Sequence, residues 1–253
     1  MVSPFGMREL LGTKQPATDA AVICDHRQAG RVVLCQLLRQ SPNAASLKAS
    51  SGPYCDDRGV PRDGQIYHQK RPEKGIFIIH EGVVRIFQTM VDGRRSIIRF
   101  LFPGDVLWVD HATQHAFDAE AITAVRLCWL DGHDITQEAD EKPQLWAFLA
   151  AQMSEDLQLA QDHLVAIGRK SAVERLAGCL IMLANRQRYR GLSINPVYLP
   201  MSRSDIADYL GLTTETVSRS FSQLKADGQI TVLHKSAVRI CDIDALSRIA
   251  NGF

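Results

Sequence analysis

The sequence predicts an α+β fold in which an N-terminal antiparallel β-roll is followed by a long helix and a C-terminal winged helix-turn-helix. Three observations support this prediction. Short apolar segments separated by turn residues begin at Gln65, a helical pattern covers residues 142–168, and two short amphipathic helices joined by a glycine lie within residues 201–230. The chain has 253 residues, 45% of them hydrophobic, which suffices for one large or two small domains.

Residues 1–62 are predicted to be an irregular N-terminal segment, because prolines interrupt every long element and only residues 28–39 have a helical pattern. Three of the six cysteines, Cys24, Cys35 and Cys55, lie in this segment. The chain has neither an apolar signal core nor a run of 18 apolar residues, so we expect a cytoplasmic protein without membrane contact. In a reducing compartment the cysteines are expected to be buried thiols, metal ligands or redox sensors, not disulfides.

Residues 63–141 carry the pattern of short strands. The segments GIFIIHEGVVRIFQ, RRSIIRFLFPGDVLWV and AITAVRLCWL are separated by turn residues such as Asp92-Gly93 and Pro103-Gly104. Strands of this length broken by such turns are typical of a small antiparallel barrel or jelly roll, which would form a sensor domain.

Residues 142–168 are predicted to form a dimerisation helix. Its apolar positions are spaced 4, 3, 4 and 3 residues apart, which is the spacing of a coiled-coil seam about two heptads long. Packing on the chain's own barrel is the alternative explanation, but a parallel partner helix in a homodimer explains the seam better. The seam residues are Met153, Leu157, Ala160, Leu164 and Ile167.

Residues 169–253 are predicted to form the winged helix-turn-helix. Ser202 and Thr213 are good N-caps for the two short helices, Gly211 supplies the turn, and Gly228 ends the second helix. A preceding helix over residues 169–188 would bury Cys179, and strands at 229–232 and 238–241 would form the wing, with Cys241 structural. This part holds 12 Lys or Arg and 7 Asp or Glu, a balance of +5, against −4 for the rest of the chain. A basic module suits a phosphate backbone.

The second helix presents a chemically specific set of side chains in its first turns. An arginine there can bond guanine O6 and N7, a glutamate can accept from cytosine N4, and small hydroxyl residues can contact a thymine methyl group. The alternative to base reading is that Glu215 and Arg219, four residues apart, only form an ion pair on the helix surface. The expected base-reading residues are Thr214, Glu215, Ser218 and Arg219, and the expected phosphate contacts are Arg203, Arg188 and Lys225.

The segment Leu199–Ile230, with its core DIADYLGLTTETVSR, resembles the DNA-binding helices of the CRP/FNR superfamily of bacterial regulators, closest to the FNR and FixK branches. The segments GIFIIHEGVVRI and FPGD resemble its sensor domain, a cyclic-nucleotide-binding-like jelly roll. The resemblance implies that Glu215, Ser218 and Arg219 read a TTGAT half-site of a palindrome. It also implies a homodimeric regulator, an activator and not an enzyme, which binds double-stranded DNA, touches RNA polymerase and responds to oxygen, redox state or nitrogen oxides.

One departure from the family argues against a cyclic nucleotide. Members that bind one follow the Gly-Asp strand with a Gly-Glu pair and an Arg-Ser/Thr that holds the phosphate. After Gly104-Asp105 this chain has no Gly-Glu and no arginine before Arg126. A buried phosphate without such partners would be uncompensated.

The sequence does not decide which cofactor, if any, the protein binds. Cluster-bearing FNR relatives carry three N-terminal cysteines and one in the barrel, and Cys24, Cys35 and Cys128 match part of this set, whereas Arg27 replaces the middle cysteine. A [4Fe-4S] cluster would therefore need Cys55 or His26 as its fourth ligand. A cluster-free regulator and a haem- or metal-binding sensor are the alternatives. A cupin-like barrel enzyme using His111 and His115 is a further rival, but the clustered His and Glu of that class are absent.

Overall fold

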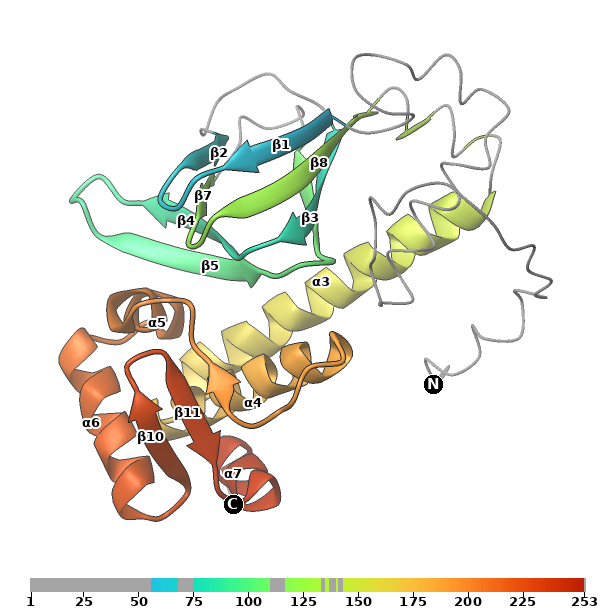
Figure 1. The fold of residues 1–253 in the computed structure, drawn as a ribbon. Helices are drawn as coiled ribbons and strands as arrows, with labels where there is room; N and C mark the ends of the chain where they lie inside the picture. Colours follow the sequence, from blue (N-terminus) through green and yellow to red (C-terminus); the bar gives the residue numbers. More distant parts are fainter. Residues whose placement is uncertain are drawn as a thin grey trace.

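A computed structural model describes residues 56–67, 75–109, 117–132, 135–136, 140 and 143–252. A β-roll, a long helix running obliquely below it, and a compact domain of helices with a small sheet follow one another along the chain (Figure 1). The predicted α+β fold with these three parts is confirmed. Among the helices of the described residues, none is both long enough and apolar enough to cross a membrane.

The roll consists of two four-stranded antiparallel sheets that face each other. The first sheet has the order β1-β8-β3-β6, with bounds Asp56–Val60, Val125–Asp131, Gly75–Glu81 and Val106–Val109. The second has the order β2-β7-β4-β5, with bounds Gln65–Tyr67, Asp118–Ala121, Val84–Thr89 and Arg95–Leu101. The interior contains buried apolar side chains from both sheets, among them Phe77, Ile79, Val84, Leu101 and Leu127.

Strand β3 explains why part of the sequence reads as a continuous apolar run. Its residues from Gly75 to His80 are all buried. Phe77 and Ile79 point into the roll, whereas Ile76 and Ile78 belong to a second apolar cluster on the outer face of the same sheet. A strand covered on both faces loses the polar-apolar alternation of a half-exposed strand.

Strand β1 corrects the predicted boundary at residue 62. Its sequence DDRGV pairs antiparallel with β8, from Asp56 opposite Trp129 to Val60 opposite Val125. The roll therefore begins by residue 56, inside the segment predicted to be irregular. An edge strand rich in charge has no apolar alternation, so the sequence pattern did not mark it. The helix predicted at residues 28–39 lies outside the described residues.

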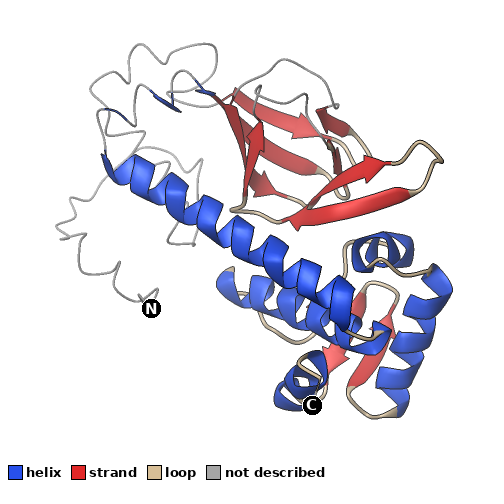
Figure 2. Ribbon diagram, turned by 180° about the vertical axis from the view of Figure 1, so that it is seen from behind, coloured by secondary structure: helices blue, strands red, loops and turns tan. Residues whose placement is uncertain are grey.

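Helix α3, Pro143–Arg169, matches the predicted dimerisation helix closely and connects the roll with the C-terminal domain (Figure 2). Its first turns pack on the outer face of the first sheet through Leu145 and Leu149, which are fully buried against Ile76, Ile78 and Cys128. The rest of the helix continues past the roll to the C-terminal domain.

The C-terminal domain is the predicted winged helix-turn-helix. Its helices are α4 Ala172–Tyr189, α5 Arg203–Leu210, α6 Thr214–Ala226 and α7 Ile243–Ala250, and its sheet has the order β10-β11-β9, with bounds Ile230–His234, Ala237–Ile240 and Val197–Tyr198. The wing is the β10-β11 hairpin. Strand β9 and helix α7 were not predicted. Strand β9 is only two residues long, whereas α7 has an Asp242 N-cap and an amphipathic pattern that the sequence analysis missed.

One apolar cluster continues from the second sheet of the roll into the winged domain. It includes Ile97 and Phe100 of β5 together with Leu180, Ile206 and Leu224 of the winged domain. The ring of Phe100 lies 5.1 Å from that of Tyr209 in α5, centroid to centroid. The winged domain is therefore packed directly against the roll, in addition to being covalently joined through α3.

Two cysteines of the winged domain differ in environment. Cys179 is buried in α4, as predicted, and burial raises the pKa of its thiol to about 12. Cys241 was expected to be structural in the same way as the buried Cys179, and this was wrong, because Cys241 is exposed. Its sulfur lies 3.6 Å from the Thr231 hydroxyl.

Candidate nucleic-acid interface

Helix α5 begins with a complete capping box. The backbone N–H of Asp205 donates to the Ser202 hydroxyl (3.0 Å), and the backbone N–H of Ser202 donates to the Asp205 carboxylate (3.0 Å). Ile206, Ala207 and Leu210 form the buried face, as their spacing predicts. Two N–H groups that the helix leaves without partners are thereby satisfied, so the first helix of the motif starts at a defined residue.

The turn between α5 and α6 depends on Gly211, which has a left-handed φ of 64°. A side chain there would be strained, because L-residues with a Cβ disfavour this conformation. Helix α6 then begins at the Thr213 cap, whose hydroxyl accepts from the Thr216 backbone N–H at 3.2 Å. Val217 and Leu224 are fully buried beneath α6, which fixes the opposite face of the helix toward solvent.

The four predicted base-reading residues, Thr214, Glu215, Ser218 and Arg219, are all exposed on the first turns of α6. Within the described part of the chain, Glu215 and Arg219 form no ion pair, so both side chains are available for contacts outside the protein. The backbone N–H of Glu215 and then the Thr213 hydroxyl hold the pKa of the Glu215 carboxyl below its usual value, with a contribution from Arg219. Glu215 is therefore an ionised hydrogen-bond acceptor near neutral pH.

Ser218 is partly committed within the helix. Its hydroxyl donates to the Thr214 carbonyl at 2.9 Å, a common bond of helical serine to the preceding turn. The hydroxyl oxygen keeps its lone pairs, so Ser218 can still accept a hydrogen bond or contact a thymine methyl group.

The three predicted phosphate contacts are placed differently. Lys225 is exposed on the last turn of α6. Arg188 is exposed on the last turn of α4.

Arg203 corrects the third expectation. Its guanidinium carbon lies 3.3 Å from the centre of the Phe221 ring, so the side chain stacks inside the motif, where burial lowers the pKa of the group. In this arrangement it braces α5 against α6 and does not extend toward a phosphate. The sequence could not show this, since the stack joins residues on two different helices.

The wing supplies two basic residues that the sequence reasoning missed. Lys235 at the tip and Arg239 on β11 are exposed, and α6 packs beside β10. The tip is shaped by His234, whose Nδ1 accepts from the Ser236 backbone N–H at 3.2 Å. The positive charges within residues 234–239 were the signal that could have identified this hairpin as a phosphate-contacting element.

The predicted dimer seam is exposed along α3. Leu157 and Leu164 are 60% and 71% exposed, and Met153, Ala160 and Ile167 are exposed as well. Val165 adds a further exposed apolar side chain beside them. A row of large apolar side chains facing solvent along one helix is typical of a protein–protein contact.

Of the four cysteines predicted as metal ligands, the structure describes Cys128. Cys128 lies on β8 and is 1% exposed, beneath Leu145 and Leu149 of α3. Cys24, Cys35 and Cys55 lie outside the described residues. In the part of the chain that is described, no three His, Cys, Asp or Glu side chains are placed to share a metal ion.

The interior of the roll is occupied by large side chains. The Phe77 and Trp129 rings are 4.5 Å apart, and the Arg58 guanidinium lies about 6 Å from both. Asp105, from the FPGD segment, is engaged elsewhere: it accepts from the Phe102 backbone N–H (2.9 Å) and from Arg186 of α4 (2.8 Å). His111 and His115 lie outside the described residues.

Two family models match the chain: the cyclic nucleotide-binding domain over residues 58–142 and the Crp-like helix-turn-helix domain over residues 174–249. The nitrogen fixation regulation protein FixK of Bradyrhizobium diazoefficiens is 39% identical over 171 residues, 67% of this chain and 71% of the relative. The chain belongs to the CRP/FNR superfamily, on its FNR/FixK-like branch.

Further similarities agree with this assignment. The transcriptional activatory protein AadR of Rhodopseudomonas palustris is 34% identical over 186 residues, 72% of this chain and 77% of the relative. The solved structure of FixK2 from Bradyrhizobium japonicum superposes with a TM-score of 0.71 at 32% identity, covering 77% of this chain and 96% of that one. This CRP/FNR protein is thus a DNA-binding transcription regulator.

Proposed function

We propose that the protein is a homodimeric activator that reads a palindrome of TTGAT-type half-sites with α6. One observation carries the proposal: Glu215, Ser218 and Arg219 stand exposed on the first turns of α6, whose buried face and caps fix its orientation. In a major groove, Arg219 would bond a guanine, Glu215 would accept from a cytosine and Ser218 would contact a thymine methyl. Lys225, Lys235 and Arg239 would contact phosphates, and the site of action would be the bacterial cytoplasm.

Dimerisation through α3 would create the palindrome specificity. The exposed seam of Met153, Leu157, Ala160, Leu164 and Ile167 would pair with the same seam of a second copy. Such a parallel pair has two-fold symmetry, which an inverted repeat in DNA shares.

Activation requires a surface that contacts RNA polymerase, and the β4-β5 hairpin is our candidate. Val91 at its tip is fully exposed and Met90 nearly half exposed, although both are apolar. The hairpin projects from the roll on the side where α5 and α6 of the winged domain lie (Figure 1). The name of the AadR relative supports an activating role.

The signal is a separate proposal. An oxygen, redox or nitrogen-oxide response fits the FixK and FNR relatives, and a [4Fe-4S] cluster on Cys24, Cys35 and Cys128, with Cys55 as the fourth ligand, is the candidate cofactor. A cofactor-free regulator and a haem- or metal-binding sensor are the alternatives. The visible absorption spectrum of anaerobically purified protein tests the cluster. Protein with a cluster is brown and bleaches in a Cys128→Ser variant, whereas a cofactor-free regulator is colourless.

The test of the proposed function is Arg219→Ala, with Lys225→Ala as its control. Loss of a bidentate guanine contact should cost about 1–3 kcal/mol on a TTGAT palindrome and remove the preference for guanine at that position. Lys225→Ala should weaken binding to all duplexes similarly and lower the salt slope by about 1. Fluorescence anisotropy with single-base variants of the duplex measures both. An equal loss for Arg219→Ala on specific and random DNA would contradict the proposal.

A further inference from the structure

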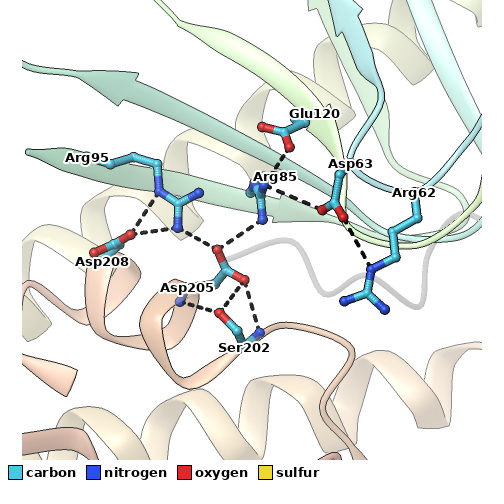
Figure 3. A network of polar contacts seen from close by, with 8 residues as sticks. All are labelled: Arg62, Asp63, Arg85, Arg95, Glu120, Ser202, Asp205 and Asp208. Atoms are coloured by element: carbon cyan, nitrogen blue, oxygen red, sulfur yellow. Dashed lines mark hydrogen bonds and ion pairs between the residues drawn. The ribbon is translucent and has the colours of Figure 1, made fainter. Parts of the chain in front are cut away.

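A network of ion pairs joins the roll to the first helix of the DNA-binding motif (Figure 3). Asp205 is at its centre and uses its two carboxylate oxygens differently. Oδ2 accepts from the Ser202 hydroxyl (2.7 Å) and backbone N–H, which caps α5, while Oδ1 accepts from Arg95 (2.6 Å) and Arg85 (3.1 Å) of the roll. We refer to Arg85, Arg95, Asp205 and Asp208 as the interdomain clamp.

Each arginine of the clamp is held by a second acid. Arg95 also donates to Asp208, one turn further along α5, at 2.8 Å, and its guanidinium lies 5.7 Å from the Phe87 ring centre. Arg85 donates to Glu120 of β7 at 2.6 Å. Both guanidinium groups are therefore fixed in position, and Arg95 bridges two acids on the same face of α5.

The clamp is shielded from solvent. The Asp205 side chain is 5% exposed, and those of Arg85 and Arg95 are 12% and 25% exposed. Burial alone would raise the pKa of Asp205, but the Ser202 hydroxyl and N–H, followed by Arg85 and Arg95, outweigh it and keep the pKa below its ordinary value. The carboxylate is ionised at neutral pH, and an ion pair that is mostly buried holds its geometry better than an exposed one.

A second device fixes the opposite end of α5. The Arg175 side chain donates to the carbonyls of Ile167 at 2.7 Å, Lys170 at 2.8 Å and Leu210 at 3.0 Å. These carbonyls belong to the end of α3, the break before α4 and the end of α5. The winged domain is consequently held at two points, one on the roll and one at the end of the dimerisation helix.

From this arrangement we propose that Arg85 and Arg95 are positioning residues for DNA reading. By holding Asp205 and Asp208 they set the angle between α3 and the winged domain, and α6 follows because the tight turn at Gly211 joins it to α5. The reading residues are exposed in the clamped arrangement, so the clamp pre-organises each domain for the groove. In a dimer this angle decides which half-site spacing both α6 helices can reach together. The inference rests on the proposed function.

The experiment compares two double variants of the full-length protein. Arg85→Gln/Arg95→Gln removes the clamp and leaves α5 and its cap unchanged. Arg94→Gln/Arg126→Gln is the control, because it also removes two positive charges from the roll. Neither arginine belongs to the clamp: Arg94, which is 82% exposed, pairs with Asp92 in the same hairpin, and Arg126 pairs with Glu81. The probes are a duplex with two inverted TTGAT half-sites at the spacing that wild type prefers, the same duplex lengthened by one base pair, and a duplex with one half-site.

Relative to the control, the clamp variant should bind the palindrome about tenfold more weakly, because the second domain is no longer pre-positioned for the second half-site. Its affinity for the single half-site should stay within about twofold, since the reading surface is intact. Its preference for the native spacing over the lengthened duplex should shrink. A merely structural role in folding would not change spacing preference while sparing the single half-site.

Three results would overturn the proposal: an equal loss on the single half-site, an unchanged spacing preference, or tighter binding of the palindrome. If circular dichroism shows that the double variant is unfolded, Asp208→Asn decides instead, since it removes only the bridge to Arg95, with Asp244→Asn in α7 as its control. Asp208→Asn should weaken palindrome binding and spacing preference in the same direction but less than the double variant. If Asp208→Asn and Asp244→Asn bind the three duplexes identically, the proposal is overturned. A wild-type protein that binds scrambled DNA as tightly as the palindrome would instead contradict the proposed function.

Discussion

His163 is the residue whose titration bears most directly on the joint between α3 and α5. Its ring stacks on that of Tyr209, with centroids 4.3 Å apart and 14° between the planes. Burial lowers the pKa of His163; a bond to the Tyr209 backbone acts against this, and Arg175 lowers the pKa further. The folded protein therefore prefers the neutral imidazole.

This preference predicts a pH dependence of stability. Because the folded-state pKa is below the unfolded value of about 6.5, the unfolded state binds more protons between the two values, and stability is lost as pH falls through this window. Urea unfolding at pH 8 and pH 5.5 should show a larger loss for wild type than for His163→Gln. Equal losses in the two proteins would show that His163 does not titrate differently on folding.

At the scale of single residues, the sequence predicted what depends on near neighbours. Ser202, Thr213 and Gly211 act on residues three or four positions away, so their roles follow from local pattern. Arg203 and Asp205 have partners from other elements, and the bond from Arg85 to Asp205 spans 120 residues of sequence. No local pattern contains such information, which is why Arg203 was expected on a phosphate and the clamp was not expected at all.

At the scale of elements, α3 has two apolar surfaces with different partners. Leu145 and Leu149 are buried against the roll, whereas Leu157 and Leu164 face solvent. A helix that only packed on its own domain would place charged or polar residues on the remaining face. The exposed row is the part of α3 that a second copy would cover.

Leu157→Asp should therefore separate the dimer without unfolding the chain. Aspartate costs little where Leu157 is 60% exposed in the single chain, but in an apolar dimer core the charge would cost several kcal/mol. Light scattering should give a monomer mass, with an unchanged circular dichroism spectrum. Leu192→Asp, at an exposed leucine outside α3, should remain dimeric. A dimer mass for Leu157→Asp would place the interface elsewhere.

Elements differed in how well the sequence predicted them. The long helix and strands β3, β4, β5, β6 and β8 have sustained apolar patterns, and the sequence located them correctly. Strand β7, with the sequence DAEA, lies almost entirely outside the predicted segments. Strand β1, with the sequence DDRGV, and β9, with two residues, are held by pairing with β8 and β11 and not by their own composition. Pairing partners far along the chain decide such strands, so tertiary context overrides local propensity.

At the scale of the whole molecule, the roll and the winged domain form a connected structure. The shared apolar cluster, the clamp and Arg175 join them at separate points. A change in the roll could therefore reach α6 through contacts that the structure defines. The sequence predicted both domains but not their docking, because docking depends on residues that only the fold brings together.

The most direct test of the central claim is the binding of the full-length protein to three duplexes at physiological salt. These carry two inverted TTGAT half-sites, one half-site, or none, and are otherwise identical. We expect two chains per palindrome, an affinity about 10³-fold or more above that for the scrambled duplex, and an intermediate affinity for one half-site. Equal affinity for the palindrome and the scrambled duplex, or a single chain per palindrome, would contradict the account.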